Sequence, residues 1–262
     1  MKNIVITGST RGIGLHMAKV FLENGCNVTV SGKTSSSFKA AKVALADYSS
    51  QLLFVPCNVQ KRREVETLWD KSAKKWGAID YWVNNAGQNA PYEYIHNTDK
   101  KNVDAVIDTN IKGLIYGSQV AAANMLIQGS GQIWNMEGLG SNGMIQSKAI
   151  LYGTTKSALT YFTKGLAKEL SHTPVLCGRL SPGMMLTDFI TKGPDGKKAQ
   201  VLSDPHFIRF FNILADKPET VAQYLVPKML KNKRQDAQIV WLTNAKAFWR
   251  FMTAPLSKRK LI

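Results

Sequence analysis

The sequence has few cysteines, few acidic residues and no long apolar run. Nothing approaches eighteen consecutive apolar residues, so we expect no membrane span. A strand is expected directly after Met1, which leaves no room for a signal or transit peptide in this sequence. The three cysteines, Cys26, Cys57 and Cys177, lie in apolar or strand-like contexts, which predicts reduced, buried thiols and a cytoplasmic protein. No cysteine or histidine cluster has metal-ligand spacing, so we expect no metal.

Acidic residues are scarce: 18 Asp and Glu stand against 34 Lys and Arg, for a net charge of +16. The basic residues are spread over helical segments such as 61–77, and no recognised nucleic-acid module is present, so we expect no nucleic-acid partner. An anionic surface, an anionic substrate or a phosphorylated cofactor would each be attracted by this positive charge, although a solvated basic surface is the simpler explanation. No linker or repeat divides the chain, which predicts one domain over residues 1–262.

Short apolar, β-branched runs alternate with segments of helical period. Such runs in a single α/β chain predict a parallel sheet that is covered by helices on both faces, a Rossmann-like doubly wound fold with ligands at the carboxyl ends of the strands. The predicted strands, about seven, cover residues 3–7, 27–31, 51–56, 80–83, 132–135, 175–180 and 238–242.

The first strand runs into a glycine-rich turn that opens a helix. Gly8, Gly12 and Gly14 allow a tight turn and close backbone approach, and the first N–H groups of the helix attract a phosphate. A turn that only joins a strand to a helix is the alternative, but the strand before it and the helix after it favour dinucleotide binding. The turn also contains Ser9, Arg11 and Ile13.

Tyr152 and Lys156 lie four residues apart in a segment with helical period, so both side chains project from one face. A free phenol titrates near pH 10, and a nearby ammonium favours the phenolate. The pair therefore predicts an acid with its own activator. Two residues on a solvated helix face are the alternative interpretation of this spacing alone.

The T-G-x-x-x-G-x-G turn, NNAG at 84–87, Asn110 in DTNIKG, the Tyr152 and Lys156 pair and SPGMMLTD at 181–188 occur in this order. Together they resemble the short-chain dehydrogenase/reductase family over residues 2–243. The resemblance implies an NAD(P)-dependent oxidoreductase that transfers hydride to or from a small-molecule carbonyl or alcohol. It assigns Tyr152 as general acid, Lys156 as the residue that lowers the pKa of Tyr152 and holds the nicotinamide ribose, and Asn110 as the holder of a relay water. Homodimers or homotetramers are expected.

The family also has a serine that orients the substrate carbonyl just after the fifth strand. Counting from the strand gives Gly138, and counting back from Tyr152 gives Leu139; neither has a hydroxyl. Ser141 is the nearest replacement and Glu137 is another polar group nearby. A turn residue without a catalytic role is the alternative for Ser141.

The end of the second strand indicates which cofactor is used. Ser31, Gly32 and Lys33 stand where an NAD enzyme of this family has an acid, and Arg11 supplies a second cation, so we expect NADP(H). The resemblance assigns further cofactor contacts to Asn58, Val59, Asn85, Ala86, Gly87, Tyr152, Lys156, Pro182, Gly183 and Thr187. Asn58 replaces the usual Asp.

Three polar or aromatic segments lie outside most of these motifs. Residues 88–97 and 183–205 follow strands and are expected over the cofactor cleft, the second as a substrate lid, with ordinary surface loops as the alternative. The C-terminal segment 244–262 is basic and aromatic. Weak association with a membrane surface through Arg250 and residues 257–260 is one interpretation, and packing on the sheet or at a subunit interface is the other.

One branch of the family is most similar: the chlorophyll b reductases, which reduce a formyl group on a chlorin ring. The similarity lies in NMEGLGSNG, YGTTK and RLSPGMMLTD and continues through IVWLTNAKAFWRF, with Met136, Glu137, Gly138, Gly140 and Ser141 in place of the usual serine pair. We therefore predict an NADPH-dependent reductase of aldehydes or ketones, either for a chlorin or, in a bacterial relative, for another bulky substrate. The alternatives are a steroid, 3-oxoacyl or small-ketone reductase and a non-catalytic NADP(H)-sensing protein.

Overall fold

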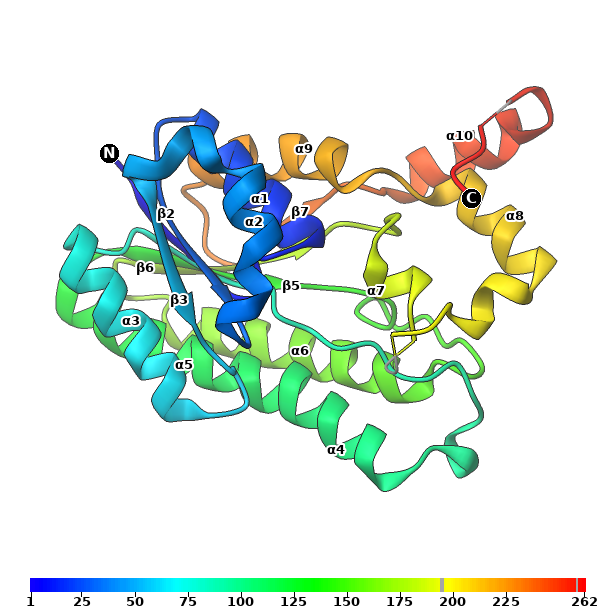
Figure 1. The fold of residues 1–262 in the computed structure, drawn as a ribbon, viewed down its shortest axis with the longest axis horizontal. Coiled ribbons are helices and arrows are strands. Elements are labelled where there is room, and N and C mark those ends of the chain that lie inside the picture. Colours follow the sequence, from blue (N-terminus) through cyan, green and yellow to red (C-terminus); the bar gives the residue numbers. More distant parts are fainter. Residues whose placement is uncertain (194–195, 258) are drawn as a thin grey trace.

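A computed structural model describes residues 1–193, 196–257 and 259–262. Its centre is one seven-stranded sheet in the order β3-β2-β1-β4-β5-β6-β7, and every neighbouring pair is parallel (Figure 1). The predicted doubly wound fold is confirmed, and each strand begins and ends within two residues of its predicted bounds. The strands are β1 Asn3–Ile6, β2 Asn27–Gly32, β3 Leu52–Pro56, β4 Tyr81–Asn84, β5 Gly131–Met136, β6 Val175–Ser181 and β7 Ala237–Val240.

Helices cover both faces of the sheet. On one face lie α1 Gly12–Glu23, α2 Phe38–Ala44 and α9 Pro218–Lys231 (Figure 1). On the other lie α3 Arg62–Trp76, α4 Lys100–Ile107, α5 Gly113–Gln128 and α6 Ile150–Glu169. The two strands at the centre show why both layers are needed: Trp82 of β4 packs in the core under α3 and α5, whereas Trp134 of β5 packs in the core under α1 and α9. Strands that are apolar on both faces need a helix layer on each.

The helix that runs from α4 to α5 is bent where it passes the site. Residues Asp108–Lys112 form a π-helical turn between the two helices, and Asn110 lies buried inside it. A π-turn adds a residue to the helical ladder and displaces the backbone locally, and such turns often occur at functional sites. The bend brings the Asn110 side chain to the carboxyl end of the sheet.

The carboxyl ends of β1 and β4 define the switch point of the sheet, because the chain leaves β1 toward one helix layer and β4 toward the other. The loops after β5 and β6 end at the same edge. The segment after β6 contains α7 Asp188–Thr191 and a 3₁₀ turn, Gln200–Ser203, before α8 Pro205–Leu214. Residues 194–195 of the predicted lid lie outside the described residues.

The C-terminal segment lies beyond the end of the sheet, where α10 Asn244–Thr253 lies beside α8 (Figure 1). Asp216 fastens it there: its carboxylate accepts hydrogen bonds from Trp241 Nε1 at 2.6 Å and from Arg250 and Arg259, and Arg250 Nη1 lies 2.8 Å from Oδ2. Burial disfavours its charge, but these hydrogen bonds outweigh burial and lower the pKa of Asp216. Arg250, one of the residues considered for contact with a membrane surface, binds Asp216 instead. Residue 258 lies outside the described part of this segment.

Candidate active site

The glycine-rich turn after β1 packs directly against the turn after β4. Gly8 has φ +63°, and a Cβ built on it would lie 2.8 Å from the Ala86 Cα, so a side chain has no room there. The N-cap residue of α1, Arg11, makes no side-chain capping bond. The first N–H groups of α1 therefore point out of the turn at the positive end of the helix dipole, an arrangement that fits an anion such as a dinucleotide pyrophosphate.

Buried hydrogen bonds hold this turn in place. Thr7 Oγ1 accepts from the N–H groups of Asn85 and Ala86, both at 3.0 Å. Asn85 Nδ2 donates to the carbonyls of Thr7 and Gly8, both at 2.9 Å. Asn85, a predicted cofactor residue, thus uses its carboxamide to fix the backbone of the glycine turn. Thr7, which begins the T-G-x-x-x-G-x-G turn but is not among the predicted site residues, is the centre of this arrangement.

Two serines join the ends of β1 and β2. The hydroxyl of Ser9 donates to the Ile6 carbonyl at 2.7 Å and accepts from the Ser31 N–H at 3.0 Å. Both serines are fully buried, and the Ser31 hydroxyl has no hydrogen-bond partner among the described residues. Their side chains therefore shape the turn from beneath, while the neighbouring Gly32 ends β2 and Lys33 projects to the surface.

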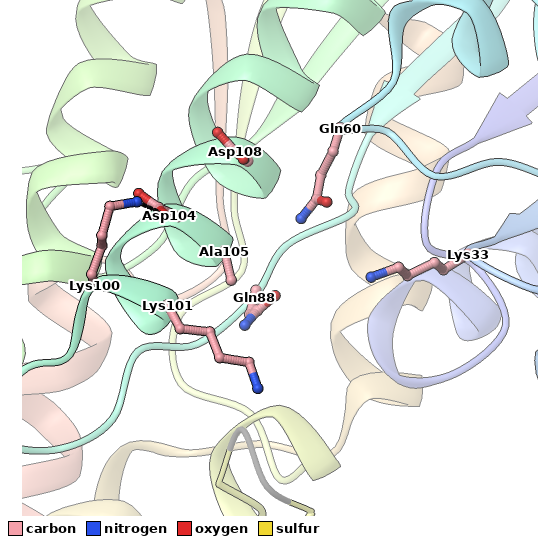
Figure 2. Close-up of a pocket in the computed structure, with 8 residues that line it drawn as sticks. All are labelled: Lys33, Gln60, Gln88, Lys100, Lys101, Asp104, Ala105 and Asp108. Atoms are coloured by element: carbon pink, nitrogen blue, oxygen red, sulfur yellow. Dashed lines mark hydrogen bonds and ion pairs between the residues drawn. The ribbon is translucent and has the colours of Figure 1, made fainter.

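A cavity of about 750 Å³ opens between the end of β2 and α4. Figure 2 shows Lys33 reaching into it from the β2 side and Lys101 from α4, with Gln60 and Gln88 between them. The acidic residues on its α4 wall are already paired, Asp104 with Lys100 at 2.5 Å and Asp108 with Lys112 at 2.8 Å. The cavity therefore presents cations to an anionic group.

The β3 end forms the wall beside this cavity. Asn58 Oδ1 accepts from the Gln60 N–H at 3.2 Å, and the Asn58 N–H donates to Glu64 at 2.7 Å. That backbone bond, with help from Lys61, lowers the pKa of Glu64. Val59 is buried against Gly113 at the start of α5. The adenine contact assigned to Asn58 stays a prediction.

Tyr152 and Lys156 lie side by side on α6. The Lys156 ammonium lies 5.7 Å from the centre of the Tyr152 ring and donates to the Met136 carbonyl at 2.8 Å. Burial lowers the pKa of Lys156 to about 8, and the charge of Glu137 acts in the opposite direction. Burial raises the pKa of Tyr152. The expected pairing in space is present, but the expected lowering of the tyrosine pKa is not, because burial determines the direction of the shift.

The backbone of Gly138 lies directly against the phenol. A Cβ at this position would be 2.4 Å from the Tyr152 hydroxyl and 3.3 Å from the Lys156 Cε. Counting from β5 therefore finds the residue that faces the tyrosine, and a hydroxyl cannot be placed there without moving the phenol. The Ser141 hydroxyl instead accepts from the Gly138 N–H at 3.1 Å and donates to the Lys156 carbonyl at 3.3 Å. It closes the loop onto α6, and its catalytic role stays a prediction.

Asn110 joins three segments around the pair. Its carboxamide accepts from the Gln88 N–H at 2.8 Å and donates to the Gln88 carbonyl at 2.9 Å and to the Thr155 hydroxyl at 3.1 Å. Gly87 packs beside the Asn110 oxygen. No sequence signal identifies Gln88 or Thr155 as site residues, because neither is part of a spaced motif. The water relay assigned to Asn110 stays a prediction.

The two predicted cleft segments meet over the tyrosine. The Phe189 ring of α7 packs edge-on against the Tyr152 ring, with centres 5.7 Å apart, and Asn89 Nδ2 donates to the Phe189 carbonyl at 2.9 Å. Thr187 lies opposite Gly12, 3.7 Å from where a Cβ would stand. Pro182 is buried and Gly183 has φ +70°, which turns the chain from β6 toward α7. The segment after β6 therefore contacts both the glycine turn and Tyr152.

Comparison with known proteins agrees with this arrangement. A family model described as short chain dehydrogenase matches residues 2–198. The chain belongs to this family. Short-chain dehydrogenases are NAD(P)-dependent oxidoreductases, and the predicted family is thus confirmed. Within the described ranges, which omit 194–195 and 258, no helix is long and apolar enough to cross a membrane and no side-chain cluster could hold a metal ion.

Relatives within the short-chain dehydrogenases include plant proteins named for chlorophyll. The probable chlorophyll(ide) b reductase NYC1, chloroplastic, of Arabidopsis thaliana is 32% identical over 98% of this chain and 54% of its own length. The chlorophyll(ide) b reductase NOL, chloroplastic, is 33% identical in Arabidopsis thaliana and 34% in Oryza sativa subsp. japonica. These matches cover 98% and 96% of this chain and 75% and 74% of the relatives. The chain thus spans about half of NYC1 and three quarters of NOL.

Solved structures share the fold. A closed form of serine dehydrogenase complexed with NADP+ superposes with a TM-score of 0.80 at 22% identity, covering 92% of this chain and 95% of the other. A 3-ketoacyl-(acyl-carrier-protein) reductase from Brucella melitensis complexed with NADH gives 0.79 at 20% identity, covering 94% and 98%. These neighbours contain different nicotinamide nucleotides, so the likeness is one of fold and does not choose between the two.

Proposed function

We propose that this chain is an NADPH-dependent carbonyl reductase in which Tyr152 is the general acid. The observation that carries the proposal is the Tyr152 hydroxyl lying against the bare backbone of Gly138, with the buried Lys156 beside it and Asn110 on the adjoining bent helix. This group stands at the carboxyl end of the sheet, next to a turn shaped for a pyrophosphate.

The residues of the site fit a nicotinamide dinucleotide. The open N-terminus of α1 would hold the pyrophosphate, and the β3 and β4 ends would flank the adenine and the ribose. The bound dinucleotide supplies the hydride. Tyr152 keeps its proton at neutral pH because burial raises its pKa, and it gives that proton to the carbonyl oxygen as negative charge develops there. Lys156 stabilises the phenolate that remains.

Positive charge near the end of β2 supports a preference for NADPH. Lys33 and Lys101 face one cavity from opposite sides, and Arg11 stands exposed at the start of α1 (Figure 2). A 2′-phosphate would gain charge-assisted contacts there that a free hydroxyl would not. No acidic residue at the end of β2 opposes it, since Ser31, Gly32 and Lys33 occupy that place.

The proposed substrate is a bulky carbonyl compound, with the formyl group of a chlorin as first candidate. Two observations support it: the names of the plant relatives, and Gly138 facing the phenol where a side chain would narrow the space. In this reaction hydride adds to the formyl carbon, the oxygen takes the Tyr152 proton, and a hydroxymethyl group results. A steroid, a 3-oxoacyl thioester or a small ketone would react with the same geometry.

The test is reduction of candidate substrates by the purified chain with NADPH. Turnover is measured as the loss of NADPH absorbance, and the product is identified by chemical analysis. The substrates are chlorophyllide b, a steroid ketone, a 3-oxoacyl thioester and a small ketone. We expect turnover of chlorophyllide b, and none with Tyr152→Phe, which should still bind NADPH. Turnover of only another carbonyl would replace the substrate, and NADPH binding without any oxidation would favour the sensing protein.

Assembly and location complete the proposal. Apolar side chains of α5 and α6, Ile127 and Tyr161, are 88% and 84% exposed, which supports a homodimer or homotetramer through these helices. Phe248 and Trp249 of α10 are exposed, which supports weak association with a membrane surface through these rings, whereas Arg250 and Arg259 are bound by Asp216. The buried, free cysteines are consistent with a reducing cytoplasm.

A further inference from the structure

A buried ion pair lies behind the catalytic lysine. Glu137 follows β5 and is 2% exposed, and Arg179 of β6 is 7% exposed. Arg179 Nη1 lies 3.5 Å from Glu137 Oε1, and its other terminal nitrogen donates to Asp236 Oδ1 at 3.0 Å. Asp236 is half-exposed in the turn before β7. Arg179 therefore has a nearer carboxylate at the surface, and the buried one is held at a longer distance.

The Glu137 carboxylate is fixed from two more elements. Gln238 of β7 donates to Oε2 at 2.7 Å, and Thr160 of α6 donates to Oε1 at 3.5 Å. The same Thr160 hydroxyl lies 3.1 Å from the Lys156 carbonyl, one helical turn away. Because the Lys156 ammonium donates to the carbonyl of Met136, the residue next to Glu137, carboxylate and ammonium approach the end of β5 from adjoining positions.

Burying the charges of Glu137 and Arg179 would destabilise the fold if the pair served packing alone. A buried carboxylate carries a large desolvation penalty, and replacing a buried ion pair with apolar residues is often neutral or stabilising. The hydrogen-bond donors of Arg179 are not all used, since its Nε has no hydrogen-bond partner among the described residues. Glu137 is linked to the lysine through the Thr160 hydroxyl, and its charge opposes the burial that lowers the pKa of Lys156, which gives the carboxylate a use that packing does not.

We propose that Glu137 is a positioning residue that acts on Lys156, keeping the buried ammonium charged and directed at the Met136 carbonyl so that Tyr152 faces a cation when it donates its proton. The inference rests on the function proposed above for Tyr152 and Lys156. By sequence, Glu137 is a candidate to replace the orienting serine, whereas the contacts direct its carboxylate toward Arg179, Gln238 and Thr160.

The sign of the effect follows from the charges around the lysine. The charged and titratable groups around this cluster in the described residues include Tyr152 from α6, Arg179 and Cys177 from β6 and Asp236 from the turn before β7. Lys228 and Arg234 line the pocket that Asp236 shares with Gln238. Burial lowers the pKa of Lys156 to about 8 and Glu137 opposes that effect. Without the carboxylate, burial and Arg179 would both disfavour the ammonium, so the cation would be lost at lower pH.

The experiment compares Glu137→Gln with the matched control Asp236→Asn, which removes the other carboxylate from Arg179 but not the one beside Lys156. The pH profile of kcat/KM for NADPH-dependent reduction is measured for each, together with the pH dependence of NADPH binding by fluorescence. We expect the alkaline limb of Glu137→Gln to move down by about one pH unit, which is a tenfold loss on that limb. Asp236→Asn should keep the wild-type limb, and Glu137→Asp should largely restore it.

Each other outcome has a meaning. A folded Glu137→Gln protein with the wild-type limb in both readouts would overturn the proposal. If that variant does not fold, Glu137→Gln with Arg179→Met is compared with Arg179→Met alone, and the same alkaline limb in both would overturn the proposal equally. Wild-type protein that binds NADPH and reduces no carbonyl would count against the proposed function alone, because the shift in the binding profile is still measurable.

Discussion

The half of the site built on β1 to β4 and the half built on β5 to β7 are held together in different ways. In the first half, the residues that motifs identify bond to backbone, as Asn85 does with Thr7 and Gly8. In the second half, side chains contact side chains across loops and strands, as Phe189 does with Tyr152 and Glu137 with Arg179. The first half is therefore fixed by hydrogen bonds to backbone from residues such as Thr7 and Asn85, whereas the second half also depends on contacts between side chains of different elements.

The largest effect is expected at the reacting centre. Tyr152→Phe removes the proton donor and should lower kcat by about 10²–10⁴-fold, the usual contribution of a general acid. The dissociation constant for NADPH should change little, since the glycine turn is untouched. Stopped-flow turnover and fluorescence titration measure the two quantities. Equal losses in both would show that the two halves are not separable.

Gly8→Ala tests the opposite half. The new Cβ would meet the Ala86 Cα at 2.8 Å and force a residue with φ +63° into strain of about 1–3 kcal/mol. NADPH binding should weaken by about ten- to a hundredfold while the fold, checked by circular dichroism, persists. Gly165→Ala in α6, where a Cβ meets nothing within 4 Å, is the matched control. Unchanged binding in Gly8→Ala would contradict the pyrophosphate assignment.

Lys33→Asp sharpens the comparison within the cofactor half. The change places an acid at the end of β2 and should shift the ratio of NADPH to NADH efficiency toward NADH by about tenfold or more, the loss of a charged hydrogen bond. Lys101→Asp should produce a smaller shift in the same direction, because it reaches the cavity from the far wall. Steady-state kinetics with each nucleotide measures both, and an unchanged ratio would refute the NADP(H) assignment.

The smallest effect is expected for Phe189→Ala. Loss of the aromatic contact with Tyr152, which is of the order of 0.5–1.5 kcal/mol, should raise KM for the carbonyl substrate by about two- to tenfold and leave NADPH binding intact. Asn89→Ala, which frees the Phe189 carbonyl from the opposite loop, should act in the same direction. A fall in kcat without a change in KM would assign the ring to catalysis instead of closure.

The sequence predicts the sheet well because buried residues form recognisable apolar patterns along the chain. Apolar runs such as that of β1 mark strands, and glycines before a helix mark the turn. The spacing of Tyr152 and Lys156 likewise places them together, since helix geometry fixes which residues share a face. These are local properties of the chain, so local patterns are sufficient to find them.

Partners from distant strands could not be predicted in this way. Nothing near Glu137 in the sequence indicates that Arg179 and Gln238 will meet it, because that depends on the order of β5, β6 and β7 in the sheet. The same holds for Asp216, which binds Arg250 across the C-terminal segment. An arginine that looks free in a basic segment is paired as soon as tertiary structure supplies a carboxylate.

Asp216 also joins two parts of the protein that have no motif in common. Its backbone pairs with the start of the segment over the cleft, through Asp216 N–H to the Met184 carbonyl and Leu186 N–H to the Asp216 carbonyl, both at 3.0 Å. Its carboxylate holds the end of the chain. A variant that alters Arg250 or Arg259 is therefore expected to disturb the segment after β6 as well, because Asp216 is hydrogen-bonded to both.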